Sequence, residues 1–211
     1  MNTKMAQAHE IRRYSGVAIG LHWLIAVAIL ANLAIGLYMN AAMQQHPGRP
    51  TPLIAQLFSV HIIIGIAVLL LTMIRLAWRL THRPPPLPAM NAPMTFLARA
   101  SHVLLYTASF LIPLTGLIVI GVGRHILPAG WFPDLGHSPD RAAVFTPQAP
   151  MHQLRVVSMF IDTHEVLAIA TIALLFLHVG AAILHHGWFR DETLHRMLPT
   201  IPARELRGSD G

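Results

Sequence analysis

The sequence contains no cysteine at all. Disulfide bonds, iron–sulfur clusters and thiolate nucleophiles are therefore excluded, and so is covalent attachment of haem through a Cys-x-x-Cys-His motif. Charge is scarce as well, because charged side chains make up only 11% of the 211 residues, against about 25% in soluble domains. With 54% hydrophobic residues, this composition is typical of a membrane protein.

Four apolar segments are long enough to cross a bilayer, whose hydrocarbon core of ~30 Å needs about 20 helical residues. Only helices or closed barrels satisfy their backbone groups in lipid, and the alternation of a barrel strand is absent from the sequence. We therefore predict an all-α membrane protein, a bundle of four transmembrane helices over residues 16–39, 57–80, 98–122 and 163–185. The first segment exceeds the ~7–15 apolar residues of a signal peptide, so we expect it to be retained.

Lysine and arginine are distributed unevenly between the two sides of this bundle. Eleven of the 15 lie in the N-terminal segment, the link between the second and third helices, and the C-terminal tail, and four lie in the opposite loops. The positive-inside rule therefore places both termini in the cytoplasm. The formal charge of +6 is then mainly a topology signal, and no soluble basic domain is present that would bind nucleic acid.

The chain divides into a cytoplasmic N-terminal segment (residues 1–13), a membrane domain (residues 14–199) and a cytoplasmic tail (residues 200–211). Within the domain, the outer loop of residues 123–161 is long for a bundle connection. Loops of this length are usually functional or disordered. We expect this one to fold over the outer end of the bundle, with a short helix near Pro150–Ser158.

Histidine stands out in the apolar segments, because an ionisable side chain at membrane depth is a candidate functional residue. His22 lies near the cytoplasmic start of the first segment, and His61 lies near the outer start of the second. On the fourth segment, His164 and His178 are 14 residues apart. That spacing is about 21 Å and nearly four helical turns, so the two histidines share one helix face.

Matching these residues by depth pairs His61 with His164 at an outer level and His22 with His178 at an inner level. Two such pairs in a bundle core are what two bis-histidine haems require. Zinc needs about four ligands close together, and a proton relay more often includes buried carboxylates, which the segments lack except at the outer edge of the fourth. Taken singly, His22 or His61 is explained as well by an interfacial polar group, but the set of four favours two haems.

Bis-histidine ligation would leave the iron without an open position for oxygen or substrate, so the ligands would mainly set a redox potential. The predicted function is therefore electron transfer across the membrane. Gly65 and Gly180 each lie within four residues of a proposed ligand. They would leave room for a flat macrocycle, or would simply let helices pack closely.

Several short motifs occur together along residues 14–199. They are His22-Trp23, the histidine that opens the second segment, and His-Glu followed by a histidine 13 residues after the glutamate. Others are Arg75 with Arg79, the run AGWFPDLG around Trp131 and Phe132, and the ending HHGWFRDETLHRMLP with Trp188, Asp191 and Arg196. This combination resembles the bacterial cytochrome b561 family.

The resemblance implies two b-type haems, with His22, His61, His164 and His178 as axial ligands of the iron, in a multi-pass protein of a bacterial inner membrane. It also implies exchange of electrons with membrane quinone. A well-known member is a superoxide oxidase, which passes electrons from superoxide at the periplasmic face to ubiquinone. Carried over, electrons would pass from the outer surface through the outer and then the inner haem to ubiquinone.

A quinone site would be expected near the cytoplasmic end of the fourth segment. His186 and Trp188 are the leading candidates, with His102 at the start of the third segment. Arg75 and Arg79 are candidate contacts to haem propionates or quinone oxygens. An interfacial aromatic belt and positive-inside anchors would explain the same residues without a quinone.

Superoxide is an anion, and a positive outer mouth would speed its capture. The four arginines of the outer side are balanced by four carboxylates, so net charge does not favour this donor over another periplasmic one. One alternative function is the cytochrome b membrane anchor of a larger hydrogenase or dehydrogenase complex. A second is a haem-free transporter whose histidines relay protons or bind metal. Neither a catalytic residue nor the oligomeric state follows from the sequence.

Overall fold

The fold is known from a computed structural model, which describes residues 13–45, 51–86, 90–124, 126 and 148–199. Four long helices dominate it: α1 (Gly16–Gln45), α2 (Pro52–Thr81), α3 (Ala92–Gly123) and α5 (Met151–Gly187). Each is long and apolar enough to cross a membrane. The predicted all-α architecture with four membrane spans is confirmed.

Two of the helices begin earlier than the apolar segments because capping residues define their starts. The Oγ1 atom of Thr51 accepts a hydrogen bond from the backbone N–H of Ile54, and the Oδ1 atom of Asn91 accepts one from Met94. Such caps satisfy N–H groups that have no partner inside the helix. A proline in the first turn of each helix needs no such partner,. Hydropathy therefore predicted that these helices exist but not the residue at which each begins.

Helix α5 has 37 residues, a length of about 55 Å, which is well beyond the bilayer core. The short helix expected near Pro150–Ser158 is the first part of α5 and is continuous with the fourth span. This part packs against the end of α3, where Val122, Leu154 and Val157 form a buried cluster. Gln153 donates a hydrogen bond of 2.6 Å to the carbonyl of Val122. The expected fold of the rest of the outer loop, with Trp131 and Phe132, lies outside the described residues.

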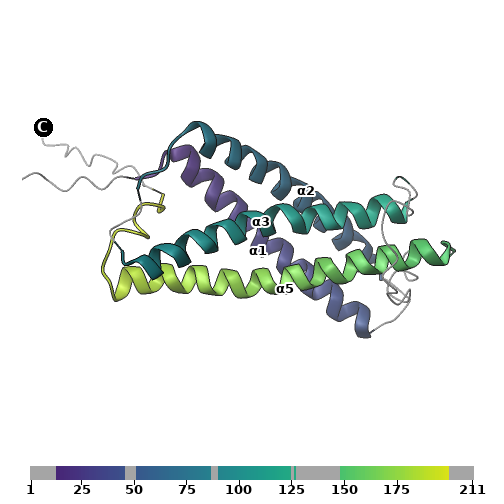
Figure 1. The fold of residues 1–211 in the computed structure, drawn as a ribbon. Coiled ribbons are helices and arrows are strands. Elements are labelled where there is room, and N and C mark those ends of the chain that lie inside the picture. The colour runs from purple at the N-terminus through teal and green to yellow at the C-terminus, as the bar shows by residue number, and fades with distance from the viewer. Residues whose placement is uncertain (1–12, 46–50, 87–89, 125, 127–147, 200–211) are drawn as a thin grey trace, which may run out of the picture.

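The four helices are arranged as two pairs. Helix α1 packs chiefly on α2 and α3 chiefly on α5, and contacts between α2 and α3 join the pairs. Figure 1 shows α3 and α5 side by side, with α1 running obliquely to them. Large apolar side chains such as Ile63 and Phe176 are exposed, as expected where a helix faces lipid tails. We call the end with the start of α1 and the end of α5 the terminal end, and the opposite end the loop end.

Residues 188–199, which we call the C-terminal strap, follow α5 across the terminal end of the bundle. The indole N–H of Trp23 in α1 donates to the carbonyl of Met197 at 2.8 Å, and the backbone N–H of Tyr14 donates to that of Arg196. The guanidinium of Arg196 donates at 2.7 Å to the carbonyl of Pro86, in the link between α2 and α3. The strap thus connects the end of α5 to α1 and to this link.

Candidate metal centres

Four histidines form two ring pairs at opposite levels of the bundle. Toward the loop end, the rings of His61 in α2 and His164 in α5 have centroids 6.0 Å apart and planes inclined by 67°. Toward the terminal end, the rings of His22 in α1 and His178 in α5 have centroids 6.3 Å apart and the same inclination. The structure therefore brings these histidines together in the pairs that matching by depth predicted.

The spacing of both pairs fits a metal ion held between two imidazoles. With metal–nitrogen bonds of about 2.0 Å on opposite sides of one ion, the ring centroids lie roughly 6 Å apart. In the described part of the chain, no group of three or more histidine or carboxylate side chains is placed to hold a metal ion. Each pair offers two imidazoles, the number that axial haem ligation requires, whereas structural zinc takes about four ligands.

The ring of His164 is oriented by α3. Its Nδ1 atom lies 2.9 Å from the carbonyl oxygen of Ile112 and 3.0 Å from Oγ1 of Thr115. Because a carbonyl only accepts hydrogen bonds, Nδ1 must hold the ring proton, and Nε2 keeps the lone pair that a metal needs. A backbone carbonyl that orients a histidine in this way is typical of metal ligands in proteins.

Two glycines allow neighbouring helices to approach the rings of the outer pair. A Cβ atom at Gly36 of α1 would lie 3.3 Å from Cε1 of His61, and one at Gly116 of α3 would lie 3.4 Å from Cε1 of His164. Of the two glycines noted in the sequence, Gly65 faces the amide of Asn32, and Gly180 has nothing within 4 Å, so it leaves open space beside α5. Gly36 and Gly116 were missed because their role depends on how the helices are rotated about their axes.

The ring of His61 differs from that of His164 in its hydrogen bonding. Its Nδ1 atom is buried and has no hydrogen-bond partner among the described residues. Buried polar atoms in proteins are almost always paired. Nδ1 of His61 thus lacks the backbone partner that Nδ1 of His164 has in Ile112.

At the inner level, His22 contacts Arg75. The Nη1 atom of Arg75 lies 2.9 Å from Nδ1 of His22, and its Nε atom donates to the hydroxyl of Tyr106 at 3.0 Å. A guanidinium only donates hydrogen bonds, so Nδ1 of His22 is the acceptor. His164 donates from Nδ1 whereas His22 accepts there, so the electrostatic surroundings of the two levels differ.

His102, a candidate quinone residue, lies instead against the inner pair. Its ring centroid is 5.8 Å from that of His178, and its Nδ1 atom is 2.6 Å from the carbonyl oxygen of Ala98. The inner level thus has a third imidazole that matching by depth did not include. The sequence contains a signal for this contact, because His102 lies ten residues after the start of α3 and His178 nine residues before the end of α5, which places the two at similar depth,.

The other two candidate quinone residues lie in different surroundings. The ring of His186 packs against that of His195, with centroids 5.0 Å apart. The side chain of Trp188 is 81% exposed, as an aromatic residue of the interfacial belt would be. Arg75 and Arg79 both lie over the ring of Tyr106, with 5.6 and 5.8 Å between guanidinium carbon and ring centroid.

The chain is similar to known proteins over most of its length. Residues 13–200 match the family model described as prokaryotic cytochrome b561. The chain is 32% identical over 205 residues to "Cytochrome b561 homolog 2" of Escherichia coli K12, covering 92% of this chain and 95% of the relative. It is 27% identical over 190 residues to "Probable superoxide oxidase CybB" of Yersinia pestis, covering 89% of this chain and 97% of the relative. The family match includes all four helices, both histidine pairs and the C-terminal strap.

Proposed function

The chain belongs to the prokaryotic cytochrome b561 family of membrane electron-transfer proteins with b-type haem, and on that premise we propose that it passes electrons from superoxide to ubiquinone through two haems. The proposed axial ligands are His61 with His164 and His22 with His178. The observation that supports this most directly is the repetition of one ring separation, close to 6 Å, at two levels of a single bundle.

In this proposal, some residues hold the haem, others contact its ligands, and the apolar helices exclude water. Bound haem would supply reversible one-electron chemistry, and with two histidines holding each iron no position would remain for oxygen. Helix α5 provides one ligand to each site and, being a continuous helix, fixes their separation along its axis at about 21 Å. The carbonyl of Ile112 orients His164 with the Nε2 lone pair free for a metal,. The contact of Arg75 with Nδ1 of His22 leaves the ring proton of neutral His22 on Nε2, so ligation through Nε2 would require this contact to be released,. The apolar spans exclude water from both sites.

The proposed donor and acceptor rest on different observations. Superoxide as donor is supported by the name of the Yersinia pestis relative. Ubiquinone would be reduced toward the terminal end, where His186, Trp188 and His102 remain proposed contacts. Arg75 and Arg79 remain proposed contacts to haem propionates or quinone oxygens, and Arg75 directly touches a proposed ligand.

We also propose that the terminal end is cytoplasmic. A fluorescent C-terminal GFP fusion would support this orientation, and an active C-terminal alkaline phosphatase fusion would contradict it.

Haem quantitation and spectra of the purified chain test the ligand assignment. We expect b-type bands in the reduced-minus-oxidised spectrum and two haems per chain. His164→Ala and His22→Ala should each retain about one haem, and the matched control His102→Ala should retain two. Absence of b-type bands would refute the haem proposal. Loss of a haem in His102→Ala but not in His22→Ala would instead identify His102 as the partner of His178.

A second experiment tests the proposed substrates. The chain is purified alone, supplied with a ubiquinone analogue and exposed to superoxide generated enzymatically. Quinol should form, superoxide dismutase should suppress its formation, and His164→Ala should abolish it. If no quinol forms and a soluble metal-containing subunit co-purifies with the chain, the membrane-anchor function replaces the superoxide proposal.

A further inference from the structure

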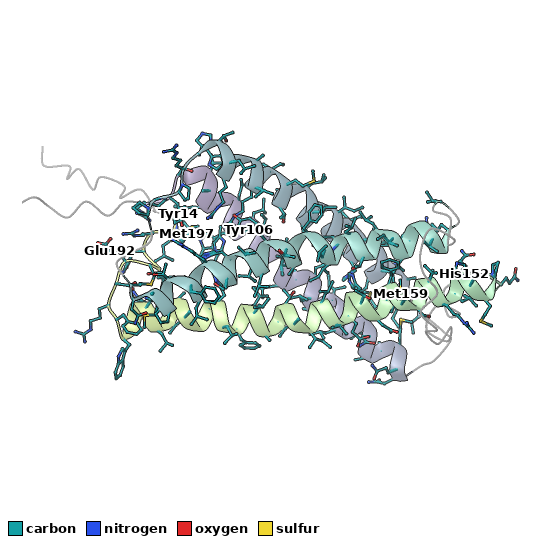
Figure 2. All side chains as sticks on the ribbon, in the orientation of Figure 1. Tyr14, Tyr106, His152, Met159, Glu192 and Met197 are labelled. Carbon is teal, nitrogen blue, oxygen red and sulfur yellow. The ribbon has the colours of Figure 1, made fainter. Side chains whose placement is uncertain are left out.

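A cavity of about 400 Å³ lies at the terminal end, and none of the four paired histidines lines it. Its walls come from four parts of the chain: Tyr14 just before α1, Trp78 of α2, Tyr106 of α3 and Met197 of the C-terminal strap. Figure 2 shows Tyr14, Tyr106 and Met197 close to one another at this end of the bundle. The strap thus closes one side of a space that α1, α2 and α3 leave between them.

The cavity is strongly positive. Four arginines line it, namely Arg13, Arg75, Arg79 and Arg83, and among the described lining residues none is acidic. Like charges around one space raise the electrostatic potential within it and attract an anion. The nearest described carboxylates of the strap have other partners, since Asp191 pairs with His185 and Glu192 with Arg196.

The cavity is distinct from the space between the inner rings. His178 and His102 do not line it, and Arg75 is the lining residue that connects it to His22. The guanidinium of Arg75 already donates to His22 and to Tyr106. Arg79 is already a proposed haem or quinone contact, so the positive charge available to an additional ligand comes mainly from Arg13 and Arg83.

The position of these arginines relates the cavity to the membrane surface. Arg79 lies in the last turn of α2 and Arg83 just beyond it, and both are exposed. The same end of α2 exposes Leu76 and Leu80, the latter by 79%. An apolar helix surface that ends in arginines matches a phospholipid, whose tails lie along the helix and whose phosphate lies at the level of the last turn.

We propose that this cavity binds the phosphate group of an anionic phospholipid head group. Arginine is suited to this role because its planar guanidinium donates two parallel hydrogen bonds to phosphate oxygens. Basic pockets between transmembrane helices are known to bind anionic head groups. The indole of Trp78, stacked on His82 with ring centroids 3.6 Å apart, forms a rigid wall beside these arginines. A bound lipid would connect α1, α2 and the strap at the terminal end.

Native mass spectrometry of the haem-loaded full chain tests this proposal. The protein is stripped of native lipid and titrated separately with phosphatidylglycerol, phosphatidylcholine and inorganic phosphate. The test variant is Arg13→Gln/Arg83→Gln, which leaves the proposed haem and quinone contacts Arg75 and Arg79 in place. The matched control is Arg99→Gln/Arg190→Gln, which removes the same charge from exposed arginines at the terminal end that do not line the cavity. Arg83→Glu is a second variant, at a single exposed position.

The wild type and the control should bind one phosphatidylglycerol in preference to phosphatidylcholine. The test variant should bind it roughly tenfold or more weakly, since each arginine near an anionic head group contributes about 1 kcal/mol, and Arg83→Glu should weaken it as well. Haem content should stay at the wild-type value in every variant.

Equal weakening of phosphatidylglycerol binding in the control variant would overturn the proposal. Displacement of the lipid by inorganic phosphate would exclude a phospholipid as the occupant. Loss of haem from the test variant would overturn it too, because the arginines would then serve the haem propionates.

Discussion

At the scale of single residues, a glycine of a neighbouring helix lies against each ring of the pair His61 and His164. His61 and His164 each present the Cε1 edge of the ring to a glycine of a neighbouring helix, Gly36 for one and Gly116 for the other. A glycine inside a helix costs up to about 1 kcal/mol relative to alanine. Helix propensity therefore disfavours both glycines, and the close approach of helix backbone to ring explains why they are tolerated.

Gly36→Val should displace the ring of His61 and lower the haem content of the purified protein from two toward one per chain. The physical reason is that the first added carbon already lies 3.3 Å from Cε1 of His61, and a branched side chain adds two more. Gly20→Val is the matched control, because Gly20 lies in the same helix with nothing within 4 Å of an added Cβ atom. Equal haem content in the two variants would show that the ring does not depend on this approach.

The pairing of the histidine rings could be predicted from the sequence, whereas the surroundings of the rings could not. The partnership of His164 with His61, and of His178 with His22, follows from the rise of a helix and the order of the spans. The contact of His102 with His178 and that of Arg75 with His22 depend on the rotation of each helix about its axis. In a segment that is apolar on all sides, hydropathy contains little information about that rotation.

At the scale of elements, the sequence likewise predicted the helices but not where they end. Hydropathy predicted four spans, but α5 continues well outside the apolar segment, through Met151–Ser158. That outer part is stable because it buries Leu154, Val156 and Val157 against α3, a contact between residues that are distant in sequence. The strap beyond α5 likewise depends on long-range hydrogen bonds, such as that from Trp23 to Met197. No local sequence pattern predicts such bonds.

The strap has a carboxylate whose ionisation should contribute to stability. Partial burial acts to raise the pKa of Asp191, but hydrogen bonds from Thr193 and the contact with His185 outweigh it, and the pKa lies below its ordinary value. The folded state therefore favours the ionised form. This stabilisation is complete above the pKa of the unfolded chain and is lost as the pH falls through the lower pKa of the folded chain.

Asp191→Asn should accordingly lower the thermal midpoint near neutral pH by roughly 2–4 °C and leave it nearly unchanged in strong acid. Unfolding of the haem-loaded protein, followed by the haem absorbance across an acidic pH series, measures this. Glu192→Gln is the control, because it removes the neighbouring charge and preserves the contacts of Asp191 with His185 and Thr193. A wild type and an Asp191→Asn variant that differ equally at every pH would contradict the assigned cause.

At the scale of the whole molecule, the bundle consists of two helix pairs that the proposed cofactors would join. Helix α1 packs on α2 and α3 on α5, while among the described residues α1 and α5 approach each other little. Each histidine pair connects the two helix pairs, because one histidine belongs to α5 and the other to α1 or α2. The Asn40 amide, which donates to Glu165 at 2.9 Å, also connects α1 to α5. Metal ligation across the division would therefore stabilise the assembly of the pairs as well as supply redox chemistry.

Removal of haem should therefore loosen the whole bundle. A ligand that binds only the folded state at a thousandfold excess over its Kd adds about 4 kcal/mol of stability, which for a chain of this size corresponds to roughly 10 °C in thermal midpoint. Protein made in haem-deficient cells should melt lower by about that amount and should be cut faster by protease between α2 and α3, where the two pairs meet. Reconstitution with haem should restore both properties in the wild type but not in His164→Ala/His22→Ala. If the haem-free and reconstituted proteins melt together, the contact between α2 and α3 and the C-terminal strap suffice to hold the pairs, and the histidines serve electron transfer alone.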